Sequence, residues 1–273
     1  MSDTTEADSC HDAGSLKKYF LCPAKLNELN KIRVGAVSYL NTKPLVYGVK
    51  RSSLMDEIEL IEEYPSKVAD MLLNDEIDVG LVPVVIIPRM KQHFIVSDYC
   101  IGAEGEVASV SLFSEVPIEQ VETVLLDYQS RTSVNLAKVL MRDFWKVSPK
   151  LEDATENYIG NIKGTTAGVV IGDRALQQRK ISTYNYDLAS AWKKMTNLPF
   201  VFAAWIANKN LDKEFMNKFN QANALGLGMI DEVVKENPYE HYDLKTYYTE
   251  NISYELTVDK KEGLNLFLKL LQG

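Results

Sequence analysis

The stretch Lys31-Ile32-Arg33-Val34-Gly35-Ala36-Val37-Ser38-Tyr39-Leu40-Asn41-Thr42-Lys43-Pro44-Leu45 decides the fold. Its apolar, β-prone residues from Val34 to Val37 predict a buried strand, and the polar residues that follow predict a turn. Pro44 suits the start of a helix, where a backbone N–H has no partner within the helix. A strand, a polar turn and a helix start in this order form a site where an anion can bind, although an ordinary connection between strand and helix fits the same residues.

The same order returns twice further along the chain. A strand over 121–126 precedes the turn Asp127-Tyr128-Gln129-Ser130-Arg131-Thr132-Ser133, and a strand over 167–171 precedes Gly172-Asp173-Arg174. Because strands and helices alternate after residue 31, the sequence predicts an α/β fold with a mainly parallel sheet. The closing helices are expected over 212–236 and 259–271.

The order of the elements predicts two lobes. The first lobe is expected to contain 32–114 and 203–273, and the second 115–202. Long strands around 109–113 and 200–206 are expected to be two crossover strands, which would let the lobes close on a ligand. Residues 1–30, with an acidic and polar beginning, are expected to form a flexible leader.

The overall composition narrows the class of protein. A formal charge of −8 over 273 residues argues against binding to nucleic acid. No apolar run approaches the roughly 18 residues that cross a membrane, so we expect no membrane partner. The odd set Cys10, Cys22 and Cys100 argues against a disulfide scaffold and favours a reducing compartment, and the leader has no secretory pattern. We therefore expect a cytoplasmic protein.

Five separated motifs resemble chorismate dehydratases of the futalosine route to menaquinone. They are Val34 to Leu45, Gly105 to Val110, Ser130 to Val134, Val170 to Leu176, and Trp192 through Trp205. The resemblance implies the fold of type 2 periplasmic binding proteins, a cytoplasmic location, and removal of water from chorismate to give 3-[(1-carboxyvinyl)oxy]benzoate. A sister family that makes 1,4-dihydroxy-6-naphthoate opens with Ser-Pro-Cys-Pro-Asn-Asp, which this chain lacks. The leader and Glu106 depart from the family pattern.

The implied substrate is a small dianion, so its enzyme needs groups that hold anions. We assign this role to Ser130, Arg131, Thr132 and Ser133, because hydroxyls and main-chain N–H groups at a helix start can donate to a carboxylate. Plain capping of the helix by Ser130 or Thr132, with Arg131 in solvent, is the alternative. The other two turns supply the further expected substrate-binding residues, which are Ser38, Tyr39, Gly172 and Asp173.

Asn41 and Ser109 are the predicted catalytic residues. The Asn41 amide can orient the departing hydroxyl or the ring carboxylate, and its alternative role is to cap the helix that begins near Pro44. Ser109 can form a hydrogen bond with the hydroxyl or the reacting edge, and its alternative role is that of a small residue packed between the lobes.

The identity of the base stays open between two hypotheses. Asp173 can act as general base, since a carboxylate in a dry cleft can have a raised pKa, or it can cap the helix after Gly172. A carboxylate of the substrate can instead take the proton itself, with the protein supplying position and desolvation.

The sequence contains no metal-ligand pattern and no glycine-rich phosphate fingerprint, so we expect neither a metal nor a cofactor. The alternative function is a solute-binding module for a small carboxylate that shares the fold and does no chemistry.

Overall fold

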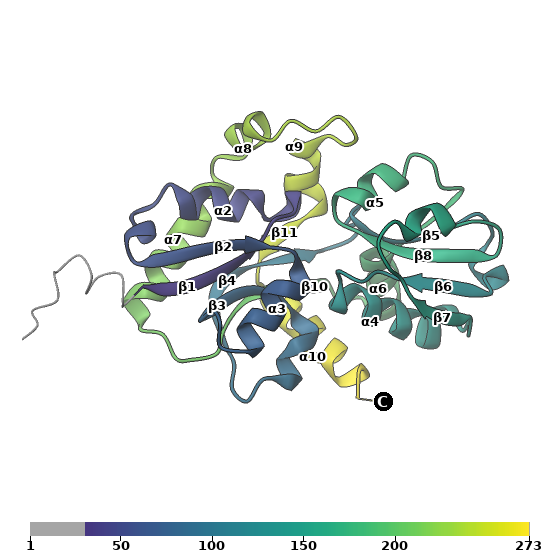
Figure 1. Cartoon of the computed structure of the whole chain (residues 1–273), viewed down its shortest axis with the longest axis horizontal. Helices are drawn as coiled ribbons and strands as arrows, with labels where there is room; N and C mark the ends of the chain where they lie inside the picture. The colour runs from purple at the N-terminus through teal and green to yellow at the C-terminus, as the bar shows by residue number, and fades with distance from the viewer. Residues whose placement is uncertain (1–30, 273) are drawn as a thin grey trace, which may run out of the picture. The chain divides into compact units, whose positions relative to one another are not determined.

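The computed structural model describes residues 31–272, which form two β-sheets with helices packed on both (Figure 1). The leader expected over 1–30, with Cys10 and Cys22, lies outside the described residues. The first sheet has the order β11-β4-β10-β3-β1-β2. Its strands are β1 Ile32–Val37, β2 Ile58–Glu63, β3 Val79–Pro83, β4 Phe94–Ala103, β10 Phe200–Ala207 and β11 Ser253–Glu255.

The second sheet has the order β7-β6-β8-β5-β9. Its strands are β5 Val110–Ser114, β6 Thr123–Leu126, β7 Lys150–Asp153, β8 Thr166–Ile171 and β9 Tyr184–Asp187. Helix α5 lies on one face of this sheet, and α4 and α6 lie on the other (Figure 1). These helices are α4 Arg131–Leu140, α5 Asp173–Gln178 and α6 Leu188–Thr196.

The first sheet is covered by α2 and α7 on one face and by α3 and α10 on the other (Figure 1). The α-helices of this lobe are α2 Lys43–Lys50, α3 Pro65–Leu73, α7 Lys213–Leu227, α8 Ile230–Glu236, α9 Leu244–Thr246 and α10 Val258–Leu270. The short 3-10 helices of the chain are η1 Leu40–Thr42, η2 Ser53–Asp56, η3 Val84–Arg89, η4 Ile118–Gln120 and η6 Tyr158–Asn161, and the π-helical turns are η5 Met141–Trp145 and η7 Tyr247–Asn251.

The α/β fold with two lobes is confirmed, but the expectation of a mainly parallel sheet is wrong. Strand β1 runs parallel to β2 and β3, whereas β10 runs antiparallel to both β3 and β4. The reason is the path of the chain. Strand β4 leads out of the first lobe and β10 leads back into it, so the two neighbours point in opposite directions.

The strand pairing also places the boundaries between the lobes at other residues than expected. Strand β5 pairs with β8 and β9, so 110–114 belong to the second sheet, and β10 from Phe200 onward belongs to the first. Neither expected crossover strand is shared between the sheets. The chain instead crosses through Glu104–Ser109, which we call the crossing segment, and returns after α6.

The single helix expected over 212–236 is interrupted. Helix α7 ends at Leu227, and Met229 adopts a backbone φ of −122° and ψ of 35°, outside the helical region, before α8 begins. Trp192 and Trp205 are fully buried in the core, where their indole N–H groups donate to Pro199 and Asn223. Among the described residues no helix is long and apolar enough to cross a membrane.

Two glycines let α2 lie directly against α7. A Cβ atom at Gly226 would be 1.8 Å from the Pro44 carbonyl oxygen, and one at Gly48 would be 1.9 Å from the Ala222 carbonyl oxygen. Both obstacles are backbone atoms, which cannot rotate away. This close crossing fixes α2, and with it the turn that carries Asn41.

We expect Gly226→Ala to lower the free energy of unfolding by about 1–3 kcal/mol, because the added methyl group forces two helices apart. Chemical denaturation measures the change. Gly160→Ala is the matched control, since nothing lies within 4 Å of a Cβ atom there, and its effect is expected to stay within about 0.5 kcal/mol. Equal stability of the two variants would contradict the close-packing argument.

Candidate active site

A cavity lies between the two lobes, at the ends of β1 and β8. Six of the ten predicted site residues line it, and they are Tyr39, Asn41, Ser130, Thr132, Ser133 and Gly172. Apolar and weakly polar residues complete the wall, namely Val37, Thr42, Pro65, Pro83, Ile101, Val107, Val110, Ile171, Phe202 and Ala203. The cavity volume is about 50 Å³, whereas small-molecule sites commonly measure about 300–1,000 Å³. A ring with two carboxylates therefore enters only when the walls move apart.

The start of α4 presents hydrogen-bond donors to this cavity. Ser130 is the N-cap, and its Oγ accepts the N–H of Ser133 at 3.1 Å, so the capping alternative holds for this residue. The Thr132 hydroxyl has no partner among the described residues although the residue is only 2% exposed. Together with the N–H groups of the first helical turn, which have no acceptor within the helix, this hydroxyl can bind an anion.

Asn41 faces the α4 start from the first lobe. It lies in η1 directly after β1, and its backbone carbonyl accepts the Tyr254 hydroxyl at 2.9 Å. Its side-chain oxygen accepts from Thr42, and its side-chain nitrogen has no acceptor within 31–272. The N-cap of α2 is Thr42, so the alternative in which Asn41 caps this helix is wrong. The free amide nitrogen is available to a ligand.

Asp173 connects the lobes rather than lining the cavity. Its Oδ1 accepts the N–H of Leu40 at 3.2 Å, and its backbone carbonyl accepts the Tyr239 hydroxyl at 2.7 Å. Burial raises the pKa of the Asp173 carboxyl, and the Leu40 N–H and the charge of Lys43 oppose this rise. The N-cap of α5 is Gly172, so the expectation that Asp173 caps this helix is wrong.

Gly172 has a backbone conformation reserved for glycine. Its φ is 62°, and a Cβ atom there would be 3.1 Å from the ring of Tyr39. Its N–H donates to the Ser109 carbonyl at 2.8 Å. The ring of Tyr39 thus packs on a glycine backbone of the other lobe.

The three remaining predicted residues lie off the cavity wall. Ser38 is exposed, and Arg131 forms an ion pair with Asp70 of α3 at 2.8 Å. Arg131 therefore lies neither in the cavity nor free in solvent, because its charge is used to join the lobes. One of its nitrogens, Nη1, is buried and has no hydrogen-bond partner in the part of the chain that the structure describes. Ser109 is fully buried, and its Oγ accepts the Tyr247 hydroxyl at 2.7 Å.

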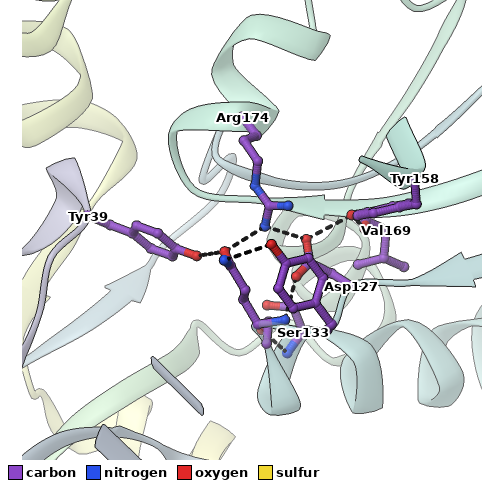
Figure 2. A network of polar contacts seen from close by, with 9 residues as sticks. Tyr39, Asp127, Ser133, Tyr158, Val169 and Arg174 are labelled. Carbon is purple, nitrogen blue, oxygen red and sulfur yellow. Dashed lines mark hydrogen bonds and ion pairs between the residues drawn. The ribbon is translucent and has the colours of Figure 1, made fainter. Parts of the chain in front are cut away.

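A network of polar contacts lies next to the start of α4 (Figure 2). We did not predict this network from the sequence. Arg174 donates to Asp127 and to Gln129, each at 2.8 Å, and the Tyr158 hydroxyl donates to the same Asp127 oxygen at 2.8 Å. The Asp127 side chain is fully buried, and burial raises its pKa while the Arg174 charge opposes the rise.

Tyr39 reaches this network from the first lobe and donates its hydroxyl to Gln129 (Figure 2). Burial raises the pKa of the Tyr39 hydroxyl above its usual value, so this group remains a donor. The network fixes the turn before α4 and joins it to the turn after β1. The signal in the sequence was that Asp127 opens the turn before α4 and that Arg174 lies within the motif from Val170 to Leu176.

The crossing segment is fixed by a buried carboxylate. Asp187 accepts the N–H groups of Ala108 at 2.9 Å, Val107 at 3.1 Å and Ser190 at 2.9 Å. Ala108 has a φ of 63°, and the Ser109 N–H donates back to the Val107 carbonyl at 2.8 Å, which forms a three-residue turn of a strained kind. This turn sets the position of Ser109.

Within 31–272 no group of three or more His, Cys, Asp or Glu side chains is arranged to hold a metal ion. The polar groups that face the cavity are a hydroxyl-bearing helix start and a side-chain amide, both of which suit a carboxylate.

Two lobes around such a cavity define the class of periplasmic-binding-protein-like folds. The chain is similar to the periplasmic aliphatic sulphonate binding protein SsuA from Escherichia coli, with a TM-score of 0.57, 14% identity, and coverage of 89% of this chain and 86% of that one. The sequence narrows the class further. Residues 32–272 match the family described as Menaquinone biosynthesis, and the chain belongs to this family.

Two relatives carry the name chorismate dehydratase. The protein from Thermus thermophilus is 24% identical over 261 residues, which cover 87% of this chain and 94% of the relative. The protein from Campylobacter jejuni is 27% identical over 243 residues, which cover 86% of this chain and 95% of the relative.

The Asp187 carboxyl predicts a specific pH dependence of stability. Burial raises its pKa to about 6, against the three N–H donors that favour the charged form. Its pKa in the unfolded chain is about 4. Between about pH 4 and pH 6 the folded state therefore keeps the Asp187 proton while the unfolded chain loses it. The stability that the protonated Asp187 contributes is lost as the pH rises through about 6.

We expect the free energy of unfolding of the unmodified chain to fall by about 2–3 kcal/mol between pH 4 and pH 7, relative to Asp187→Asn. Denaturation of both proteins across this range measures the difference, in which contributions from the other titrating groups cancel. A difference that does not change with pH would contradict the assignment.

Proposed function

We propose that the protein is a chorismate dehydratase that removes water from chorismate to give 3-[(1-carboxyvinyl)oxy]benzoate. The observation that carries the proposal is a pair of donors on one cavity wall, the buried Thr132 hydroxyl and the Asn41 side-chain nitrogen, which come from opposite lobes and have no hydrogen-bond partner among the described residues. The family and the names of the two relatives support chorismate as the substrate.

The two carboxylates of chorismate match the two kinds of donor. The start of α4 offers N–H groups, the Thr132 hydroxyl and the positive end of the helix dipole, which contributes about 0.3–1 kcal/mol. Asn41 approaches from the other lobe and orients the ring carboxylate or the hydroxyl. Because the chain carries a net charge of −8, these local donors must overcome an unfavourable overall field.

The reaction needs the loss of one proton and one hydroxyl from the ring. The C–H bond on the carbon that bears the enolpyruvyl ether breaks, and its electron pair joins the ring. The neighbouring C–O bond breaks, and the departing hydroxide leaves with the proton as water. Substrate and product differ by one water, so the reaction balances without an oxidant or reductant.

The geometry favours a carboxylate of the substrate as the base. The Asp173 carboxylate already accepts the Leu40 N–H of the other lobe, and this bond makes it less available as a base. The enolpyruvyl carboxylate is attached beside the C–H bond. The α4 start binds one side of this carboxylate, and its remaining oxygen lies against the mostly apolar part of the cavity wall, where loss of water favours uptake of the proton. The cytoplasm, the reducing compartment expected from the cysteines, is the proposed place of the reaction.

The first test is direct. Purified protein mixed with chorismate is expected to release the substituted benzoate, seen by ultraviolet absorption and by a mass lower by one water. Thr132→Val removes only the hydroxyl, and we expect KM to rise about 10- to 100-fold because a hydrogen bond to a carboxylate is lost.

Thr183→Val is the matched control, because Thr183 is exposed and outside the cavity wall, and its KM is expected to equal that of the unmodified chain. Binding of chorismate without formation of any product would contradict the proposed enzymatic function. The alternative function, a solute-binding module for a small carboxylate, would then remain.

Asp173→Asn separates the two candidate bases. If a carboxylate of the substrate takes the proton, we expect the variant to keep kcat within about threefold of the unmodified chain, since its amide oxygen can still accept the Leu40 N–H. Single-turnover and steady-state rates at several pH values measure this. Complete loss of turnover in a variant that folds and binds substrate would instead make Asp173 the base.

A further inference from the structure

We propose that Tyr247 is a positioning residue for catalysis, which acts by donating a hydrogen bond to Ser109 and so leaves the Ser109 O–H free to donate a hydrogen bond to the departing hydroxyl. This inference rests on the proposed chorismate dehydratase activity. Tyr247 lies 138 positions after Ser109 in the chain, and no pattern in the sequence connects the two.

The hydrogen bonds around Ser109 leave its side chain little freedom. Its carbonyl accepts the N–H of Gly172 at 2.8 Å, and its N–H is used in the turn with Val107. Its Oγ accepts the Tyr247 hydroxyl at 2.7 Å. The backbone of Ser109 is thus held by the second lobe, whereas its hydroxyl is held by an element close to the C-terminus.

The element that carries Tyr247 is itself fixed to the crossing segment. Tyr247 begins the π-helical turn η7 and is fully buried. Asn251, at the end of the same turn, donates its side-chain N–H to the Glu106 carbonyl at 3.2 Å. Two bonds therefore tie η7 to the segment on either side of Ala108. Such a rigid support is the arrangement expected for a group that must hold a precise position.

The direction of the bond gives it a chemical consequence. Tyr247 donates, so the Ser109 Oγ accepts and its own proton points elsewhere. Hydrogen bonds in series strengthen one another, so a hydroxyl that accepts from tyrosine becomes a better donor. Complete burial raises the pKa of Tyr247 well above its usual value, which keeps the phenol protonated and in the donor role.

Ser109 lies where such a donor is useful. Val107 and Val110, on either side of it, both line the cavity, so Ser109 adjoins the substrate once the cavity widens. As the ring C–O bond breaks, negative charge develops on the departing oxygen. The Ser109 O–H stabilises that charge by a hydrogen bond, and the proton from the ring completes the water. No tyrosinate forms in this step.

Tyr247→Phe tests the proposal, because it removes one hydroxyl and keeps the ring. We expect kcat for chorismate dehydration to fall about tenfold while KM stays within twofold. Ser109→Ala is expected to lower kcat at least as much. The double variant Tyr247→Phe/Ser109→Ala is expected to equal Ser109→Ala alone, because the tyrosine acts only through the serine.

Tyr248→Phe is the matched control. Tyr248 is the next residue of the same turn and is 2% exposed, but its hydroxyl has no partner among the described residues, so kcat is expected to be unchanged. A kcat for Tyr247→Phe equal to that of the unmodified chain would overturn the proposal. Two other results would also overturn it. One is a loss of kcat in the double variant equal to the product of the two single losses, and the other is a loss of kcat in Tyr248→Phe as large as that in Tyr247→Phe, since each would indicate an effect of packing alone.

The outcomes also separate this inference from the proposed function. If the unmodified chain does not dehydrate chorismate, the function fails and the role of Tyr247 fails with it. If the unmodified chain is active and Tyr247→Phe is equally active, only the role of Tyr247 fails. Should Tyr247→Phe not fold, 3-fluorotyrosine at position 247 replaces it. This stronger donor is expected to raise kcat, and an unchanged kcat would overturn the proposal.

Discussion

The N–H groups in the first turn of a helix have no acceptor within that helix, and the candidate site depends on this constraint. At α4 the Ser130 hydroxyl accepts one of these groups, and the remaining ones face a cavity beside the Thr132 hydroxyl. The opposite wall supplies the Asn41 amide from η1. A ligand that offers oxygen atoms on two sides can accept from both walls at once. These local donors are needed because the net charge of −8 disfavours the binding of an anion.

The same requirement explains how the lobes meet in this structure. The Asp173 carboxylate accepts the Leu40 N–H, so a group of the second lobe occupies a donor at the helix start of the first. The Arg131–Asp70 ion pair and the bond from Tyr39 to Gln129 join the lobes nearby. These contacts leave a cavity of about 50 Å³, so binding of a ring must exchange contacts between the lobes for contacts with the ligand.

Patterns among neighbouring residues predicted the local strands, turns and helix starts. The motif from Val34 to Leu45 became β1, η1 and α2, and six predicted site residues from three turns came to line one cavity. Interactions over long sequence separations were not visible. Strand β11 and the bond from Tyr247 to Ser109 both join the C-terminal part of the chain to residues near 100, and no local pattern encodes such pairing. The roles of Arg131 and Asp173 were missed for the same reason, because their partners lie on the other lobe.

A crystal structure with 3-[(1-carboxyvinyl)oxy]benzoate bound tests the central claim most directly. The account predicts the product between the lobes, with one carboxylate within hydrogen-bond distance of the Thr132 hydroxyl and the first N–H groups of α4, and with the Asn41 amide nitrogen on the other side. Product density outside the cavity between the lobes, or a carboxylate held by other groups while Thr132 and Asn41 stay without a ligand, would contradict it.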